Sequence, residues 1–150
     1  MSFQKTFEVR WADLDANRHV RHTVYNDYAT HVRFSYLASQ GFDERAFRER
    51  DIGPVLLREE TRFHREVMGG DTLTIDIRLA GLSPDGGRFT IAHDVVRSDD
   101  IKAATVVVDG GWLELVSRKL VRPPPDLHDV LQRMTRSEGF QSLSSLGWGD

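Results

Sequence analysis

Hydrophobic and polar residues alternate at the start of the chain. The apolar positions fall on one side of an extended segment, with polar residues between them: Phe3, Phe7, Val9 and Trp11. A period of two is typical of a strand with one buried face. We therefore predict an opening strand that reaches Trp11, followed by a polar loop up to His22.

The pattern becomes helical from about residue 23 to residue 40. Apolar residues recur at intervals of three and four, and others widen the stripe. This wide apolar surface predicts a mostly enclosed helix, and Gly41 is a suitable C-terminal stop. A short second helix is expected at about 43–50. The stripe contains Tyr25, Tyr28, Ala29, Val32 and Tyr36, with Val24, Phe34 and Leu37 beside it.

Most of the remaining chain alternates as strands do, with strands expected at about 55–67, 72–79, 89–95 and 101–115. The turns between these segments are short, and short connections favour antiparallel pairing. Within the last of these strands, the pair Gly110-Gly111 predicts a bulge or a bend.

A run of prolines at 123–125 ends the predicted sheet. A final helix is expected over about 126–135, with Asp126 as its N-cap. Residues 137–150 are rich in Ser and Gly and are expected to form a loose tail. The preceding residues, 1–136, have a length that suits a single domain.

One long, enclosed helix needs a sheet to cover its apolar surface. The order of the elements therefore predicts an α+β domain in which a single helix lies on a curved antiparallel sheet. The free edges and the far face of such a sheet often pair with another copy, so we expect a homo-oligomer.

The composition excludes several classes of protein. The chain has 150 residues and no cysteine, which excludes disulfides, thiolate metal sites and a cysteine nucleophile. A formal charge of -3, from 20 basic and 23 acidic residues, argues against a nucleic-acid partner, which usually requires a basic excess. The longest uncharged apolar stretch, 103–108, is too short to cross a membrane. The N-terminal residues lack an apolar signal core, so we expect a cytoplasmic location.

The densest polar cluster occupies residues 11–22 and allows three interpretations. The first is a calcium-binding loop. Asp13, Asp15 and Asn17 fit the first three ligand positions of an EF-hand, but Arg18 stands where that loop requires Gly. The calcium interpretation is therefore disfavoured.

The second interpretation is a metal site that uses His19 and His22, whose spacing of three suits one helical face. The sequence shows no further ligands beside them.

The third interpretation is a catalytic carboxylate that faces a helix N-terminus, where unpaired N–H groups can hold a developing oxyanion. Asp13 or Asp15 could supply that carboxylate, or could merely cap a turn, and spacing alone does not choose between them.

The residues around this cluster resemble a known signature. The segment 9–15, VRWADLD, is followed by His19-Val20 and then by Val24-Tyr25. This arrangement is similar to the 4-hydroxybenzoyl-CoA thioesterase-like group of hot-dog-fold proteins. The later stretch 111–124, with its Gly-Trp start and Pro-rich end, resembles the last strand of that group. The resemblance covers about residues 3–126 and implies a hot-dog fold, in agreement with the predicted element order.

The resemblance implies an acyl-CoA thioesterase that hydrolyses a thioester to CoA and a free acid. It assigns the catalytic carboxylate to Asp15 and the oxyanion donor to a backbone N–H near His22, while Asp13 supports the turn. Asn17 and His19 are candidates for positioning water or the carboxylate. Whether the carboxylate attacks the thioester or activates water is left open.

The resemblance also implies residues that bind substrate. Arg88 matches the place of a basic residue near the nucleotide, and Arg118 and Lys119 form a second basic cluster with Arg122. Tyr25 is a candidate for both the core and the acyl pocket. No metal or cofactor is implied, and the site is expected to be shared within a homodimer or homotetramer.

Three further expectations complete this picture. Many relatives have Gly where this chain has Arg18, so the turn is expected to differ or to direct Arg18 toward the pocket mouth. His93 lies on an apolar strand face and is expected to be a core or interface histidine. The main alternative function is a non-catalytic module that binds acyl-CoA or an acyl carrier. A hot-dog dehydratase would need a His-carboxylate pair at other positions.

Overall fold

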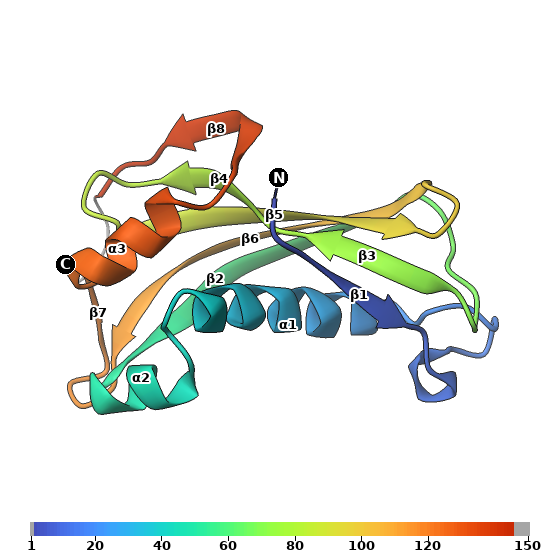
Figure 1. Cartoon of the computed structure of the whole chain (residues 1–150), viewed down its shortest axis with the longest axis horizontal. Helices are drawn as coiled ribbons and strands as arrows, with labels where there is room; N and C mark the ends of the chain where they lie inside the picture. Colours follow the sequence, from blue (N-terminus) through green and yellow to red (C-terminus); the bar gives the residue numbers. More distant parts are fainter. Residues whose placement is uncertain (1, 146–150) are drawn as a thin grey trace.

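The computed structural model describes residues 2–145 (Figure 1). Three helices, one short 3-10 turn and eight strands follow one another along this part of the chain. Their bounds are β1 (Gln4–Glu8), η1 (Trp11–Asp13), α1 (Val24–Ser39), α2 (Glu44–Glu49), β2 (Ile52–Phe63), β3 (Thr72–Asp76), β4 (Arg78–Leu82), β5 (Arg88–Arg97), β6 (Lys102–Glu114), β7 (Lys119–Val121), α3 (Pro125–Gln132) and β8 (Arg136–Ser142).

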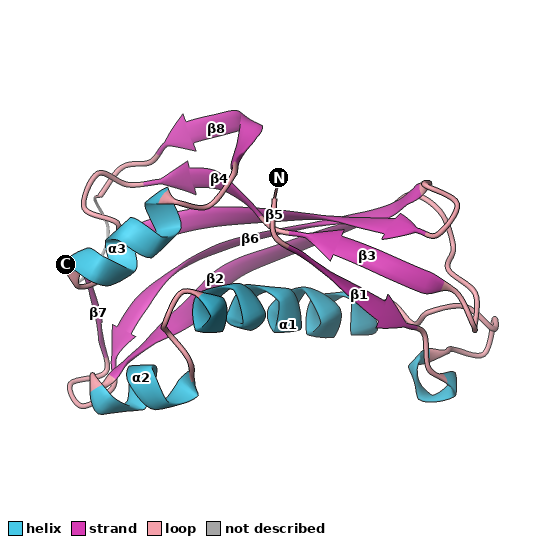
Figure 2. Cartoon of the chain, viewed as in Figure 1, coloured by secondary structure: helices cyan, strands magenta, loops and turns pink. Residues whose placement is uncertain are grey.

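All eight strands belong to one sheet, and α1 lies across one face of it (Figure 2). The long strands β2, β6 and β5 run antiparallel to one another, and β5 continues the sheet to both β3 and β4. Strand β1 pairs with β3 at one margin, and β8 pairs parallel to β4 at another. This confirms the predicted α+β architecture, with one long helix on a curved, mostly antiparallel sheet.

The core lies between α1 and the sheet, as the helical stripe predicts. Ala29 and Val32 are fully buried on the inner face of α1, against equally buried strand residues such as Ile75 and Val95. The helix begins at Val24 and ends at Ser39, within one residue of the predicted bounds. The side-chain period therefore locates the central helix closely.

The first strand is shorter than predicted. It ends at Glu8, and the chain then turns through η1, which leaves Trp11 90% exposed instead of buried. The turn is held because the carboxylate of Asp13 reaches back and accepts from the guanidinium and the backbone N–H of Arg10. A local charge pair thus overrides the alternation that placed Trp11 on the buried face.

The strand predicted at 72–79 is two strands, β3 and β4, because its hydrogen-bond partner changes at Ile77. Strand β3 pairs with the end of β5, and β4 pairs with its beginning. The carboxylate of Asp76 accepts the backbone N–H of Asp94 at this junction, 2.7 Å away. The apolar alternation runs on through Ile77 and so conceals the break.

A bulge or bend is expected at Gly110-Gly111 of β6, but the bulge lies on the neighbouring strand, β2, opposite these glycines. Strand β6 is continuous, and β2 carries the extra residue at Leu57, between the pairs Leu56–Gly110 and Arg58–Asp109. A Cβ atom at Gly110 would lie 2.5 Å from the carbonyl oxygen of Val55. The glycine is needed because the bulged strand approaches its backbone so closely.

The expectation of a loose tail from residue 137 is wrong for residues 137–142, which belong to β8. The strand is held to β4, and beyond it the N–H of Leu143 donates to the carbonyl of Leu82 at 3.0 Å. Phe140 packs against the core, with the Arg136 guanidinium 4.2 Å from its ring. Residues 146–150 of the expected tail lie outside the described residues.

The predicted cap of the last helix is also wrong. Helix α3 begins at Pro125 with Pro124 as its N-cap residue, and no side chain caps it. The carboxylate of Asp126 instead forms a two-point pair with Arg50, at 2.8 and 2.5 Å. A proline at the first helical position is pre-organised for the helix and needs no N–H acceptor there.

One edge of the sheet is open in the described chain. Strand β2 pairs only with β6, so the other side of this 12-residue strand has no partner among residues 2–145. Leu57 and Phe63 of β2 are half exposed, as is Phe34 of α1. A long, exposed strand edge beside apolar side chains is a typical pairing surface. No helix in the described residues is long and apolar enough to cross a membrane.

Candidate active site

The loop between β1 and α1 is organised by the carboxylate of Asp13. The residue is only 1% exposed, and its carboxylate accepts from Arg10 Nη2 at 2.8 Å and from Arg10 Nε at 3.1 Å. The Tyr28 hydroxyl donates at 2.6 Å to Asp13 Oδ2, the oxygen that also accepts from Arg10 Nε. These hydrogen bonds, led by those from Arg10, lower the pKa of Asp13 to about 2. Asp13 is therefore an ionised anchor whose acceptors are occupied.

Asp15, two residues later, lies in a tight turn and is more accessible. Its Oδ1 accepts the backbone N–H of Asn17 at 2.8 Å and that of His19 at 3.4 Å. Its Oδ2 lies 3.1 Å from Nδ1 of His19. The backbone N–H of Asp15 in turn donates to the carbonyl of His19 at 2.9 Å. The turn thus holds this carboxylate in place and leaves 28% of the side chain exposed.

Arg18 closes this turn with a backbone that suits glycine. Its φ angle is +68°, in the left-handed region, which costs an L-residue about 1–2 kcal/mol. Its N–H donates to the carbonyl of Asp15 at 3.1 Å. The chain therefore keeps a glycine-type turn at this position even though the residue is arginine.

A pocket of about 380 Å³ brings together four of the predicted site residues. Asp15, His19, His22 and Tyr25 line it on the side of the loop and of α1. The pKa of Tyr25 is raised by burial and, secondarily, by the negative charge of Asp15. The end of β2 and the residues after it supply most of the remaining wall: Phe63, His64, Arg65 and Glu66.

The backbone at the start of α1 offers hydrogen-bond donors beside this pocket. Val24 is the first helical residue, and its N–H donates to the carbonyl of Arg21 at 3.0 Å. The N–H groups of His22 and Thr23 have no acceptor within residues 2–145. Donors at a helix N-terminus carry partial positive charge and can bind an oxyanion.

The wall supplied by β2 is what the sequence reasoning misses at this site. Phe63 contacts the Tyr25 ring edge-on, with 5.3 Å between the ring centroids. His64 bonds Thr105 through Nε2 at 3.1 Å. The alternation at 55–67 predicts that both residues lie on a strand; β2 ends at Phe63, and only the folded chain brings its end to the loop.

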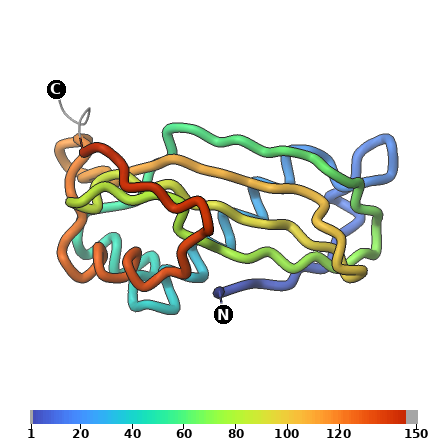
Figure 3. The backbone as a smooth tube through the Cα atoms, turned by 90° about the horizontal axis from the view of Figure 1, so that it is seen from above, coloured from blue at the N-terminus to red at the C-terminus, as the bar shows by residue number. Residues whose placement is uncertain are grey.

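The other predicted substrate residues lie elsewhere in the chain. Arg88 follows the turn between β4 and β5, and Arg118 and Lys119 lie where β7 begins. Both places are at the end of the molecule opposite the Asp15 loop (Figure 3). One chain alone therefore does not bring these cations to Asp15. Asn17 contacts Asp15 through its backbone and does not line the pocket.

The site does not have the features of a metal centre. Within residues 2–145, no group of three or more His, Asp or Glu side chains converges in a way that could hold a metal ion. The EF-hand positions Asp13 and Asp15 face different partners, since Asp13 is closed off by Arg10 and Tyr28.

Solved structures of other proteins resemble this chain closely in fold. A hypothetical protein from Aquifex aeolicus matches with a TM-score of 0.79 and 25% identity, over 86% of this chain and 98% of its own. A Staphylococcus aureus protein in complex with CoA matches with a TM-score of 0.83 and 18% identity, over 91% and 87%. A 1,4-dihydroxy-2-naphthoyl-CoA thioesterase from Synechocystis matches with a TM-score of 0.78 and 16% identity, over 89% and 97%.

Sequence comparison gives the family. No curated protein matches significantly, but the thioesterase-like superfamily matches residues 9–131, which include the Asp15 loop, α1 and strands β2 to β7. This range spans most of the 150-residue chain. The chain therefore has the hot-dog fold and belongs to the thioesterase-like superfamily, as its 4-hydroxybenzoyl-CoA thioesterase-like signature predicts.

Proposed function

We propose that this protein is an acyl-CoA thioesterase that hydrolyses a thioester to CoA and a free carboxylic acid. One observation carries the proposal. An accessible carboxylate, that of Asp15, shares a pocket with His22, which stands just before α1 and whose N–H has no acceptor among the described residues. Membership of the thioesterase-like superfamily supports the reaction class.

In the proposed reaction, the thioester carbonyl oxygen accepts a hydrogen bond from the N–H near His22. This donor stabilises the negative charge that develops as the carbonyl carbon becomes tetrahedral. Asp15 acts on the same carbon, either by direct attack or by removing a proton from an attacking water. By either route, water is consumed, the C–S bond breaks, and the thiol of CoA and a carboxylic acid leave.

His19 has a positioning role in this proposal. Its ring Nδ1 lies 3.1 Å from Asp15 Oδ2, and its backbone N–H also points to that carboxylate. These contacts restrain the Asp15 side chain, which matters because catalysis depends on closely held reacting groups. Tyr25 and Phe63 supply apolar ring surface for the acyl group in the same pocket.

We further propose that a second copy completes the site, in a homodimer or homotetramer. Arg88, Arg118 and Lys119 lie far from Asp15 in one chain, yet the phosphates of CoA require cations. The open edge of β2 and the apolar residues beside it are suited to pairing with another copy. The CoA complex of the Staphylococcus aureus protein supports CoA as the ligand class.

The proposal is tested by measuring free-thiol release from a panel of acyl-CoAs. The wild type should cleave at least one of them, and Asp15→Asn should not. A matched control is Asp129→Asn, the same chemical change at an exposed position of α3, which should cleave like the wild type. Absence of cleavage across the panel, with CoA still bound, would instead support a non-catalytic acyl-CoA-binding module.

A further inference from the structure

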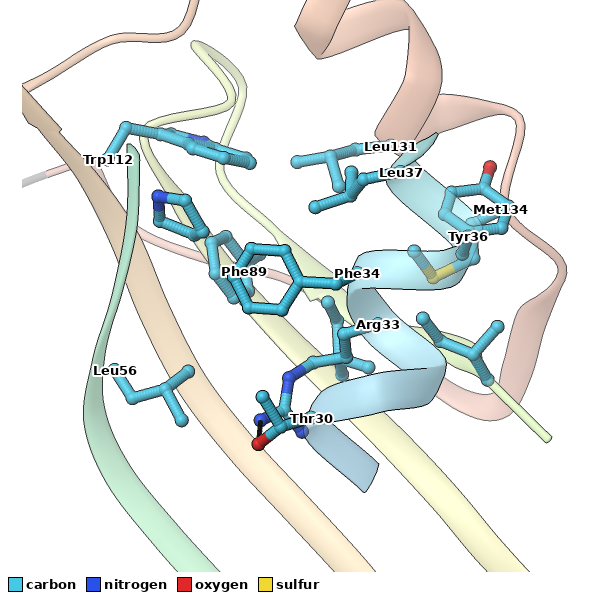
Figure 4. Close-up of a pocket in the computed structure, with 13 residues that line it drawn as sticks. Thr30, Arg33, Phe34, Tyr36, Leu37, Leu56, Phe89, Trp112, Leu131 and Met134 are labelled. Atoms are coloured by element: carbon cyan, nitrogen blue, oxygen red, sulfur yellow. Dashed lines mark hydrogen bonds between the residues drawn. The ribbon is translucent and has the colours of Figure 1, made fainter. Parts of the chain in front are cut away.

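A second cavity, of about 150 Å³, lies between α1 and the sheet (Figure 4). It shares no lining residue with the pocket at Asp15. Aromatic and aliphatic side chains, among them Phe89, Trp112 and Leu131, form one part of its wall. Arg33 and Thr30 of α1 lie together at the other end (Figure 4). The cavity is therefore apolar with a single cationic end.

Arg33 is buried, with only 7% of its surface exposed. Its Nη1 lies 3.1 Å from Nε2 of His93, and its Nη2 donates to Oγ1 of Thr30 at 2.9 Å. Neither partner is a carboxylate, and within residues 2–145 no Asp or Glu forms an ion pair with Arg33. The guanidinium thus has hydrogen-bond partners but no counter-charge in contact.

His93 is held as a neutral acceptor for this cation. The residue is fully buried, and its Nδ1–H donates to the carbonyl of Asp76 at 2.7 Å. Burial, and then the charge of Arg33, lower the pKa of His93 to about 3. The lone pair of Nε2 therefore faces the guanidinium. Of the two expected places, core or interface, His93 thus lies in the core, where it is hydrogen-bonded to Arg33 and to the carbonyl of Asp76.

Arg33 keeps its charge at neutral pH. Burial lowers its pKa to about 10, and the negative charge of the exposed Glu59 of β2 partly opposes that effect. A guanidinium has five N–H donors, and the described part of the chain supplies two acceptors for them, His93 and Thr30. Burying a cation without an anion is costly, so the free donors beside the cavity are suited to an anionic group.

We propose that this cavity binds a small carboxylate with an apolar body, and that Arg33 holds the carboxylate. Planar guanidinium and carboxylate groups match in a two-point pair. The volume, about 150 Å³, is that of an engineered protein cavity that binds benzene, so a body of about six carbons fits. Hexanoate is therefore a suitable probe.

The experiment is calorimetric titration of the protein with hexanoate and, as a neutral match, with 1-hexanol. Hexanoate should bind in a saturable way, and hexanol should bind about tenfold to a hundredfold more weakly because it cannot form the charged pair. Equal affinity for the two compounds, or no binding of hexanoate at millimolar concentrations, would overturn the proposal.

Two variants locate the binding. Arg33→Met should lose tenfold to a hundredfold in hexanoate affinity, whereas the matched exposed variant Arg45→Met on α2 should bind like the wild type. Leu56→Phe, which narrows the cavity and leaves Arg33 in place, should also weaken binding. Circular dichroism establishes that each variant is folded. A folded Arg33→Met that binds hexanoate as the wild type does would exclude Arg33 as the carboxylate site.

A carboxylate from a second copy is the competing partner for Arg33. In that case the wild type would not bind hexanoate, and Arg33→Met would lower the oligomeric mass measured by analytical ultracentrifugation. Asp15→Asn separates this site from the proposed active site. It should abolish thioester cleavage and leave hexanoate affinity unchanged, since the two pockets share no residue.

Discussion

The loop between β1 and α1 has two halves, and each contains an aspartate whose environment is opposite to that of the other. In the first half, Asp13 is buried and takes hydrogen bonds from a guanidinium and a phenol. In the second half, Asp15 is partly exposed and is held mainly by backbone N–H groups and by His19. Two residues of separation thus place one carboxylate in the scaffold and the other at a pocket.

The difference shows how the fold divides stability from reactivity. A carboxylate whose acceptors are all occupied cannot attack or remove a proton, but it can anchor a loop. A carboxylate that keeps an open side can react, provided that the turn below it is rigid. We call the half that contains Asp13 the closed half and the half that contains Asp15 the open half. The closed half supports the open half, because the N–H of Arg21, at the far end of the loop, donates to the carbonyl of Asp13 at 2.9 Å.

The largest expected effect is the loss of activity when Asp15 is substituted. Asp15→Asn should reduce kcat for thioester cleavage by about 10²- to 10⁴-fold, because the amide can neither attack nor accept a proton. Its unfolding midpoint in urea should stay close to that of the wild type, since the side chain is partly exposed. A variant that cleaves at the parent rate would remove Asp15 from the mechanism.

Asp13→Asn should have the opposite profile, with a loss of stability. The neutral amide weakens the charge-assisted bonds from Arg10 and Tyr28, which corresponds to about 2 kcal/mol in the free energy of unfolding. Urea denaturation measures this value, and Asp129→Asn on α3 is the exposed control. Unchanged stability in Asp13→Asn would mean that the loop does not depend on this anchor.

The same anchor predicts an acid-sensitive contribution to stability. The folded pKa of Asp13 is lowered to about 2, below the value near 4 of an unfolded aspartate. The contribution is therefore complete above about pH 4 and is lost as the pH falls through 2. The stability difference between wild type and Asp13→Asn should shrink over this range in urea titrations. A constant difference from pH 5 to pH 2 would contradict the assignment.

Much of the fold could be predicted because its elements carry strong side-chain periods. Helix α1 and the long strands have one enclosed and one exposed face, and that pattern is legible in a single sequence. Strand β8 could not be predicted, since most of its residues are exposed and show no period. The break at Ile77 was hidden because β3 and β4 keep the same buried alternation on either side of it.

The two pockets also differ in how far each could be predicted from the sequence alone. The loop that bears Asp15 is contiguous in sequence, so its residue types and spacing could be read together. The pair of Arg33 and His93 joins residues 60 positions apart, and each alone resembles an ordinary helix or strand residue. The cations at Arg88 and Arg118 could be noted from the sequence, but their distance from Asp15 required the fold.

The smallest effect is expected at Arg18, where the open half of the loop is strained. Its φ angle is +68°, and glycine adopts that conformation without a steric penalty. Arg18→Gly should therefore raise the free energy of unfolding, by about 1 kcal/mol, reduced somewhat by the greater freedom of glycine in the unfolded chain. Arg65→Gly makes the same chemical change at an exposed position where no left-handed angle is required, and it should destabilise the protein instead. If urea denaturation showed the same loss for both variants, the turn below Asp15 would be relaxed, and the rigidity assigned to the open half of the loop would have to come from His19 alone.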